Sequence, residues 1–351
     1  MAVLKTVQSG TVSFATGDVS KTATITAVTT ASSIVYFSFT GNTSAQTIFN
    51  QVKAELTNTT TLTFTRADNS GVIGLNWYVV EFTSGVTVQR GLSSNIGTTT
   101  NITVSTASLT TSWSILSIEI NGYSNEYGYY VSHYLSTTTN LLLTHSALDV
   151  EEAINVNWQV ITYDNASVQS ISKAFLTTDT SITSTITSVT QDHTFLEFSY
   201  TDTTAGSVAP QHVWNSYLTN ATTVTYSRNA GFFAGTARLY AISLSDSVSV
   251  QRGEKALAAL STTNALTTIV VANAFANAPS SYGRSKNDDT NTTSWNSHIT
   301  GVRLALTSTT VITFTRATNA GTVTIPWEVV EWLATTTTAA KPIFNVMWFL
   351  C

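Results

Sequence analysis

Histidine and cysteine are the residues that could hold a metal or transfer a proton in this chain, and both are sparse. The histidines are His133, His145, His193, His212 and His298. No two of them stand two or four residues apart, and none joins a cluster with cysteine, so the spacing typical of zinc ligands is missing. The single cysteine, Cys351, excludes a four-cysteine site and an intrachain disulfide. We therefore predict no metal and no cofactor.

The acidic residues are scattered singly and suggest no catalytic pair. The run Asp288-Asp289-Thr290-Asn291 is rich in oxygen ligands, but it lacks the glycine and the final glutamate of an EF-hand calcium loop. A carboxylate pair for glycoside hydrolysis is recognised by its separation in space, which a sequence does not give. No Gly-x-Ser-x-Gly elbow or phosphate-binding glycine loop is present. We predict that the chain is not an enzyme, with glycan depolymerisation as the alternative.

Hydroxyl groups take the place of charge in the composition. The 351 residues include 67 threonines and 41 serines, whereas Asp, Glu, Lys and Arg together make up 10 %, against roughly 25 % in typical soluble domains. Threonine is β-branched and suits the pleated surface of a strand. The net charge is −5, and the 15 Lys and Arg residues form no basic stripe, so nucleic acid is not an expected partner.

Three landmarks recur along the chain at intervals of about eighty residues. A Val-Gln pair ends at positions 8, 89, 169 and 251, which are 81, 80 and 82 residues apart. An apolar run occupies 77–82, 158–163, 239–244 and 327–332, and it begins with tryptophan in all but the third. A threonine-rich strand ends in Arg66, Arg228 and Arg316, with His145 at the diverged second copy. Such a period indicates repeated structural units.

Within each interval the apolar residues alternate with polar ones, as in half-buried strands, and Asn and Gly mark the turns. We predict an all-β fold of four tandem antiparallel β-sandwich repeats, immunoglobulin-like or jelly-roll-like, with six or seven strands each. The predicted units are residues 1–85, 86–166, 167–247 and 248–333, the last with an inserted loop at 280–297, followed by a linker and apolar tail at 334–351. We expect the sandwiches to stack linearly. The weak helical signal is strongest from Gly253 to Leu260.

Two sets of repeated residues have a packing interpretation and a binding interpretation. Trp77, Trp158 and Trp327 could stack on sugars, but they alternate with valines on one strand face, which favours a core position. Arg90 and Arg252 begin the second and fourth units. We predict that each pairs with a carboxylate of the preceding unit.

The chain begins without the apolar core of a secretion signal and contains no uninterrupted apolar run of about 18 residues, so we expect neither export by that route nor membrane insertion. A hydroxyl-rich, disulfide-free composition suited to an exterior surface therefore needs another explanation. Tandem Thr/Ser-rich β-repeats of this kind resemble the decoration proteins, head fibres and tail-associated proteins of tailed phages. The resemblance is one of composition and architecture along the whole chain, so it transfers no functional residue. It implies a virion protein that is made in the host cytoplasm.

The predicted function is thus a structural component of a virion surface, with other virion proteins and copies of itself as partners. The expected assembly element is the apolar tail: Ile343, Phe344, Val346, Met347, Trp348, Phe349 and Leu350. The alternative is an adhesin or receptor-binding fibre for host surface glycans. Its candidate contacts are aromatic residues outside the repeated strands: Tyr123, Tyr127, Tyr129, Tyr130, Tyr282 and Trp295. A bacterial extracellular filament or surface-layer subunit is a third hypothesis, and it would place the chain on an extracellular surface.

Overall fold

A computed structural model describes residues 2–41, 51–67, 69–121, 130–145, 153–202, 213–229, 231, 234–245, 248–280, 286–287, 301–319 and 321–333. These residues form an all-β fold of antiparallel sheets, joined by turns and by three one-turn 3₁₀ helices: η1 (Thr30–Ser32), η3 (Gln191–His193) and η5 (Val271–Asn273). No helix in the described ranges is long and apolar enough to cross a membrane.

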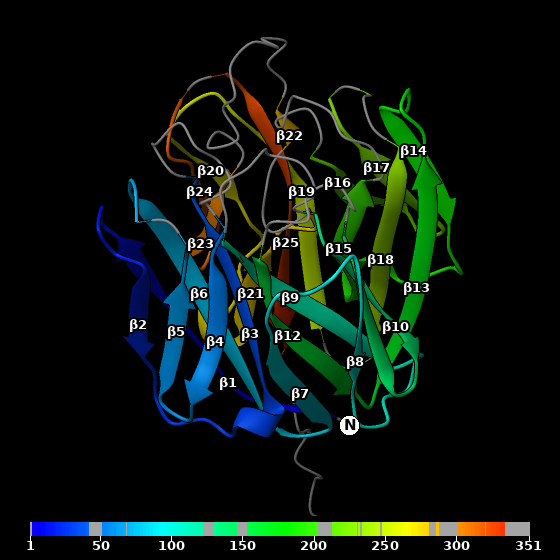
Figure 1. The fold of residues 1–351 in the computed structure, drawn as a ribbon, viewed down its shortest axis with the longest axis horizontal. Helices are drawn as coiled ribbons and strands as arrows, with labels where there is room; N and C mark the ends of the chain where they lie inside the picture. Colours follow the sequence, from blue (N-terminus) through cyan, green and yellow to red (C-terminus); the bar gives the residue numbers. More distant parts are fainter. Residues whose placement is uncertain are drawn as a thin grey trace, which may run out of the picture.

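The strands fall into four consecutive sets (Figure 1). The first set is β1 (Val3–Phe14), β2 (Ser20–Thr24), β3 (Ser33–Phe39), β4 (Lys53–Asn58), β5 (Thr61–Thr65) and β6 (Ile73–Ser84). The second set is β7 (Val86–Ser93), β8 (Thr99–Thr103), β9 (Ser112–Asn121), β10 (Ser132–Thr137), β11 (Asn140–Thr144) and β12 (Ala153–Tyr163). The third set is β13 (Ala166–Phe175), β14 (Ser181–Thr185), β15 (Thr194–Asp202), β16 (Asn215–Asn220), β17 (Thr223–Ser227) and β18 (Gly235–Leu244). The fourth set is β19 (Val248–Leu257), β20 (Ser261–Ala265), β21 (Ala274–Asn277), β22 (Lys286–Asn287), β23 (Arg303–Ser308), β24 (Val311–Thr315) and β25 (Val323–Trp332).

Every set contains two small sheets with the same strand order. The inner sheets are β1-β6-β3, β7-β12-β9, β13-β18-β15 and β19-β25-β21, and β22 also pairs with β25. The outer sheets are β2-β5-β4, β8-β11-β10, β14-β17-β16 and β20-β24-β23. Because the last long strand of each set lies in the middle of its inner sheet, we call β6, β12, β18 and β25 the central strands.

A hydrophobic core fills the space between the inner and outer sheets of a set, which makes the sets sandwich-like. In the first set, Phe14 on β1 and Leu75 on β6 share a cluster with Leu62 and Phe64 on β5, and none of the four is exposed. The alternation in β5, where Leu62 and Phe64 are buried between half-buried threonines, places one strand face on this core. The two-residue period therefore predicts the burial correctly here.

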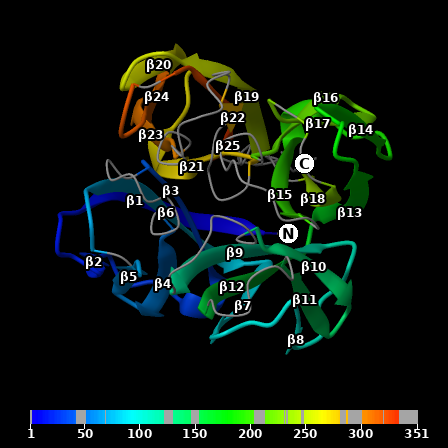
Figure 2. The ribbon, with the colours of Figure 1, turned by 45° about the horizontal axis from the view of Figure 1, so that its top comes forward.

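The central strands are buried on both faces, so each inner sheet needs a second apolar partner. Residues Leu75 to Phe82 of β6 are all buried, as near-continuous apolar runs require. The inner sheets meet around a shared centre, with the sets standing in chain order around it (Figure 2). There the ring of Phe82 packs edge-on against Tyr163 and Trp332, at centroid distances of 5.6 and 5.4 Å.

The ring of sets is closed, and the predicted linear stacking is therefore wrong. The backbone N–H of Leu306 in the fourth set donates to the Tyr78 hydroxyl of the first set at 3.1 Å. The N–H of Leu304 donates to Ser38 Oγ at 2.8 Å across the same junction. Linear stacking would leave one inner face of each end unit in water, whereas closure buries these faces.

The repeated Val-Gln pair ties an inner strand to the segment that follows the second strand of its set. Each glutamine accepts through Oε1 from one backbone N–H and donates through Nε2 to the carbonyl of the same residue. The partners of Gln8, Gln89, Gln169 and Gln251 are Thr26, Ser105, Thr187 and Thr267, at 2.6–3.0 Å. This paired hydrogen bond gives a physical reason for the period of the sequence.

We expect Gln169→Leu to lower the free energy of unfolding by about 1–2 kcal/mol, because two neutral hydrogen bonds are lost at a site that water still reaches. Urea denaturation followed by tryptophan fluorescence would measure the change. Ser172→Leu, at an exposed position of the same strand, is the control and should change the free energy by less than about 0.5 kcal/mol. Equal effects of the two substitutions would contradict the role given to Gln169.

Trp77 and Trp327 lie in the cores, as predicted, whereas Trp158 is half-buried and packs against the core of the second set. Each of the three covers a glycine on the neighbouring strand. Trp77 and Trp327 are 6 % and 5 % exposed. They stand opposite Gly10 and Gly253, and Trp158 stands opposite Gly91. A Cβ atom on these glycines would lie 2.5–3.0 Å from the indole, so only glycine fits beneath the ring. The third set has neither the glycine nor the tryptophan: Ile171 stands opposite Leu239 there.

The repeated arginines are buried and donate to backbone carbonyls near the turns of their own sets. Arg66 is 1 % exposed and donates to Asp18, Ala15, Ser70 and Gly71. Arg228 and Arg316 occupy the corresponding places and also donate to carbonyls. In the second set, the ring of His145 contacts the carbonyl of Ile96 at 3.2 Å. The three arginines therefore stabilise turns of their own sets.

The helical signal from Gly253 to Leu260 is overridden, because β19 continues through it to Leu257. Gly253 and Glu254 pair with Trp327 and Pro326 of the central strand. Packing on a buried strand therefore outweighs the helix propensity of the Glu, Lys, Ala and Leu residues.

Candidate functional site

The residue at one repeated position of each central strand is polar although its neighbours are apolar. These residues are Tyr78, Gln159, Tyr240 and Glu328, and each directly follows the repeated tryptophan or its leucine replacement. Every one of them contacts the backbone of the preceding set around the ring, so we call them the junction residues.

Tyr78 and Tyr240 lie at the fourth–first and second–third junctions, and each bonds through its hydroxyl. Tyr78 accepts from Leu306 N–H of the fourth set at 3.1 Å, and Tyr240 accepts from Leu135 N–H of the second set at 2.7 Å. Burial raises the pKa of the Tyr240 hydroxyl to about 12, so it stays neutral and can act as donor and acceptor. The two bonds lie at equivalent points of β23 and β10.

Gln159 and Glu328 lie at the first–second and third–fourth junctions, and each bonds to the backbone through a side-chain amide or carboxyl group. Gln159 accepts from Val35 N–H at 3.0 Å and donates to the carbonyl of Val35 at 2.9 Å. Glu328 accepts from Leu196 N–H at 2.9 Å, but an ionised carboxylate cannot donate back. The side chain of Asn277 donates to the Leu196 carbonyl instead, at 2.9 Å. Burial raises the pKa of Glu328 to about 7, and Arg252, 3.6 Å away, partly opposes this.

Arg90 and Arg252 lie at these same two junctions, but their partners in the preceding set differ from the prediction. Arg90 donates to the carbonyls of Thr30 and Ser33, both at 2.5 Å. Arg252 donates to the carbonyls of Gln191 and Thr194. The predicted carboxylate partner in the preceding set is thus wrong. The ends of η1 and η3 present carbonyl groups here, and a guanidinium can satisfy two of them at once.

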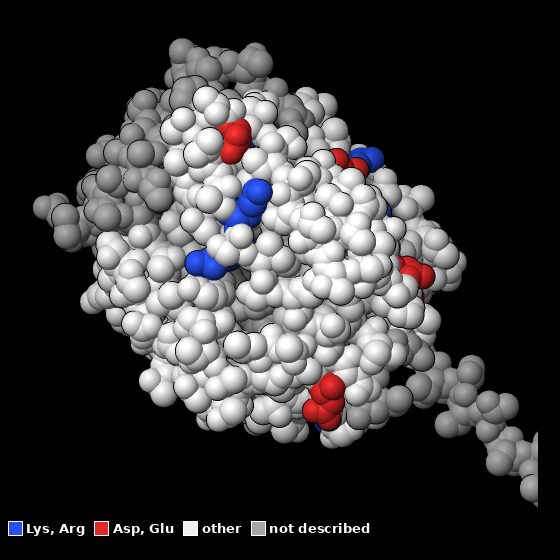
Figure 3. Space-filling model, turned by 90° about the vertical axis from the view of Figure 1, so that its right-hand side faces the viewer, with Lys and Arg blue, Asp and Glu red and all other residues white. Residues whose placement is uncertain are grey.

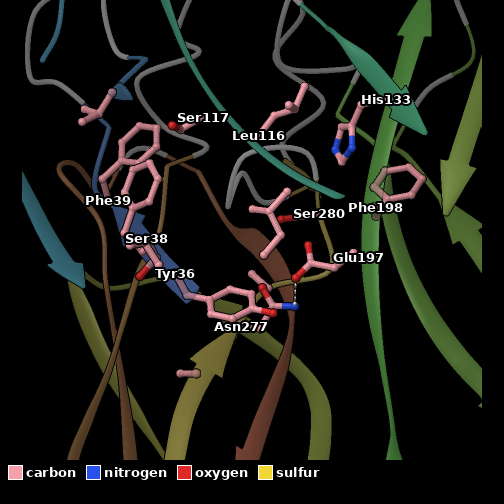
Figure 4. Close-up of a pocket in the computed structure, with 16 residues that line it drawn as sticks. Tyr36, Ser38, Phe39, Leu116, Ser117, His133, Glu197, Phe198, Asn277 and Ser280 are labelled. Carbon is pink, nitrogen blue, oxygen red and sulfur yellow. Dashed lines mark hydrogen bonds between the residues drawn. The ribbon is translucent and has the colours of Figure 1, made fainter. Parts of the chain in front are cut away.

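A cavity of about 70 Å³ is lined by residues from all four sets (Figure 4). Its walls include one residue from the third strand of each inner sheet: Tyr36, Ile115, Glu197 and Asn277. These pair with the four junction residues across the sheets. A cavity of this size, with polar groups in its walls, is large enough to hold water.

Glu197 is the carboxylate of this cavity. Burial, and next the charge of Glu328, raise the pKa of Glu197 well above its usual value. Its Oε1 lies 3.5 Å from Asn277 Nδ2, as drawn in Figure 4. Asn277 is thus shared between this carboxylate and the Leu196 carbonyl. The arrangement favours a protonated Glu197.

His133 and Ser114 form a buried hydroxyl–imidazole pair. Ser114 Oγ lies 2.8 Å from His133 Nδ1 and 3.2 Å from the Tyr240 hydroxyl. Burial lowers the pKa of His133 to about 3, so its ring is neutral. Ser114 has no exposed surface, and a nucleophile must reach its substrate. The pair therefore packs the junction of the second and third sets.

The predicted contact residues lie mostly outside the described residues. This holds for Tyr123, Tyr127, Tyr129, Tyr282 and Trp295 and for the whole tail from Ile343 to Leu350. Tyr130 is described, is 3 % exposed and stacks on Tyr200 at 4.4 Å, so it packs in the core of the third set. In the described ranges, no three His, Cys, Asp or Glu residues gather as metal ligands would.

Sequence reasoning missed the junction residues, although a signal was present. A single polar residue inside a buried apolar strand, as in Trp77-Tyr78-Val79, needs a hydrogen-bond partner. Its recurrence in every unit could have indicated an interface.

Comparison with protein-family models found no match, and comparison with curated protein sequences found none either. The fold and the junctions therefore carry the functional argument.

We expect Tyr78→Phe to lower the free energy of unfolding by about 1–3 kcal/mol, because the Leu306 N–H would be left without a partner in a largely buried site. Thermal unfolding by circular dichroism would measure this loss. Tyr217→Phe, which removes a hydroxyl from a half-buried ring without a bond in the described residues, is the matched control. If both variants unfold at the temperature of the unsubstituted chain, Tyr78 does not hold the ring closed.

Proposed function

We propose that this chain is a non-enzymatic structural component of a virion surface, of the capsid-decoration, fibre or tail-associated kind. In this proposal it consists of four tandem β-sandwich units of about eighty residues with the boundaries 1–85, 86–166, 167–247 and 248–333. The recurrence of one strand order in the inner and outer sheets supports the four units.

The observation that carries the proposal is how the interior polar groups are used. The junction residues hydrogen-bond to neighbouring sets, and the repeated arginines hold turns. Groups that could perform chemistry are therefore engaged in holding one closed body together. That use suits a protein whose task is to keep its shape.

The exterior supports the same proposal. The face in Figure 3 carries isolated charged side chains among uncharged residues. Pairs of threonine hydroxyls bond to each other on the outer sheets, as between Thr57 and Thr63 at 2.6 Å and between Thr307 and Thr313 at 2.8 Å. A neutral hydroxyl-rich surface is compatible with exposure outside a cell and with close packing against similar surfaces.

The proposed partners are other virion proteins and further copies of the chain, and the proposed attachment element is the apolar tail after residue 338. Burying an apolar side chain contributes roughly 1.5–3 kcal/mol, so seven of them would anchor a subunit firmly. The proposal implies synthesis in the host cytoplasm and display on the released particle.

Particles purified by density gradient from cells that carry the gene would test this function. We expect an antibody against the chain to label the particles, and we expect truncation after Thr338 to release the chain into the soluble fraction. Full-length chain found only in the soluble fraction would overturn the virion assignment. Truncated chain that stays on particles would overturn the anchoring role of the tail.

A further inference from the structure

A cleft of about 220 Å³ lies at the junction of the third and fourth sets, beside the central strand β25. It is lined by Tyr217, Leu218, Arg252, Gly253, Glu254, Pro279, Pro326, Trp327 and Glu328. These residues come from β16, β19, β25 and the segment after β21, and both β16 and β19 lie at this junction in Figure 2.

Two prolines explain why the cleft is there. Pro326 lies within β25 and has no N–H to donate, so it can be tolerated only where the strand lacks a neighbour. On that side β21 pairs with β25 only from Glu328 to Glu331, and β22 pairs only with Val323 and Thr324. After β21 the chain crosses to β16, where the Pro279 carbonyl accepts from Ser216 N–H at 3.0 Å. The sheet is thus interrupted where the cleft lies.

Polar groups with spare hydrogen-bonding capacity converge on this cleft. Arg252 uses Nη2 for the carbonyls of Gln191 and Thr194, and its Nη1 has no partner in the described residues. The Glu254 carboxylate is exposed and the Tyr217 ring is half-buried, and neither makes a hydrogen bond there. A guanidinium, a carboxylate and a phenol are therefore available together.

The residues that line the cleft indicate which kind of ligand would fit. Arg252 and Glu254 stand two residues apart on β19, so they lie on one strand face. Glu328, which also lines the cleft, lies 3.6 Å from Arg252 Nε, so the cleft has no excess of positive charge, which disfavours phosphate. The rings of Tyr217, Pro279 and Pro326 supply an apolar surface. A small compound with hydroxyls on its edge and an apolar face satisfies both parts, as a pyranose does, and the volume is below the roughly 300–1,000 Å³ of drug-sized pockets.

We propose that this cleft binds a single uncharged pyranose residue of a surface glycan. The sugar stacks on Tyr217, Glu254 accepts hydrogen bonds from its hydroxyls, and Arg252 donates to them. This inference goes beyond the structural role proposed above and does not depend on it, because the cleft is complete within one chain.

The corresponding place at the junction of the first and second sets keeps a guanidinium, that of Arg90, but lacks the counterparts of Tyr217 and Glu254. Register places Glu55 where Tyr217 stands and Leu92 where Glu254 stands. Leu92 is 52 % exposed. That junction therefore offers an internal comparison without the ring and without the carboxylate on β19.

Saturation-transfer NMR on the full chain would test the site, with methyl glycosides of glucose, galactose, mannose and N-acetylglucosamine as probes. We expect at least one probe to show transfer. We expect Tyr217→Ala and Glu254→Gln each to weaken its binding at least tenfold. Glu55→Gln, which removes a carboxylate at the other junction, should bind as the unsubstituted chain does.

Absence of transfer to all four probes would overturn the proposal. Transfer that persists unchanged in both cleft variants would also overturn it, because the sugar would then bind elsewhere. Equal melting temperatures of the variants and the unsubstituted chain ensure that a loss of binding reflects the site. A negative result leaves the virion assignment untouched, since the particle experiment tests that separately.

Discussion

Glu328→Gln is expected to stabilise the protein by about 3 kcal/mol at pH 8 and to change its stability little at pH 5. The pKa of Glu328 rises from 4.5 to about 7 on folding, and each pKa unit corresponds to about 1.4 kcal/mol. A glutamine could donate to the Leu196 carbonyl as Gln159 donates to Val35. The gain should therefore equal the cost of ionising a buried carboxylate.

The pH dependence of the stability follows from proton binding to Glu328. Because the folded state holds the Glu328 proton more tightly than the unfolded state, its contribution is fully present below about pH 4.5 and is lost as pH rises through about 7. Denaturant unfolding at several pH values would measure this slope, which Glu328→Gln should flatten. Gln159→Glu is the reciprocal control and should add a similar slope. A variant that is less stable than the unsubstituted chain at pH 8 would show that the carboxylate is favourable there.

Gly91→Ile is expected to cost about 3 kcal/mol or more, and Trp158→Leu in the same chain should restore most of that loss. The Cβ of the isoleucine would lie 2.6 Å from the indole of Trp158, so the half-buried ring must leave its position against the core. The third set already contains the compensated pair, with Ile171 opposite Leu239. The double variant copies that pair into the second set.

A double-mutant cycle would measure this coupling by urea denaturation of the two single variants and the double variant. We expect Trp158→Leu alone to be destabilising, because it leaves a space above Gly91. The interaction free energy should favour the double variant by about 2 kcal/mol. Additive losses would mean that glycine and tryptophan are not matched to each other, and the joint loss in the third set would need another cause.

The all-β class and the repeated landmarks could be predicted from local patterns, because strand alternation and turn residues act over a few positions. The glutamine of Val-Gln marks the period well, yet its bonds to Thr26 and its equivalents depend on how two strands lie in space. The sequence pattern located that residue without revealing what it does.

The arrangement of the sets could not be predicted, because it depends on surfaces far apart in the chain. Phe82, Tyr163 and Trp332 lie at or near the ends of three central strands, and only the fold brings their rings together. The arginine prediction failed for a related reason. The sequence predicts a carboxylate partner for Arg90 and Arg252 in the preceding set, but each donates to backbone carbonyls at the 3₁₀ turn of that set.

The cleft at the third junction was also invisible in the sequence. Tyr217 and Pro326 belong to no repeated landmark, and their meeting with Arg252 depends on the interruption of pairing along β25. A proline inside an otherwise apolar strand is the one local signal that could have indicated an opening.

Differential scanning calorimetry of the full chain tests most directly whether the strand sets form one closed structural body. The structure predicts a single transition in which the calorimetric and van't Hoff enthalpies agree, and Tyr78→Phe should move that whole transition to lower temperature. Separate transitions, of which only one responds to Tyr78→Phe, would contradict closure and would indicate that the sets unfold as independent units.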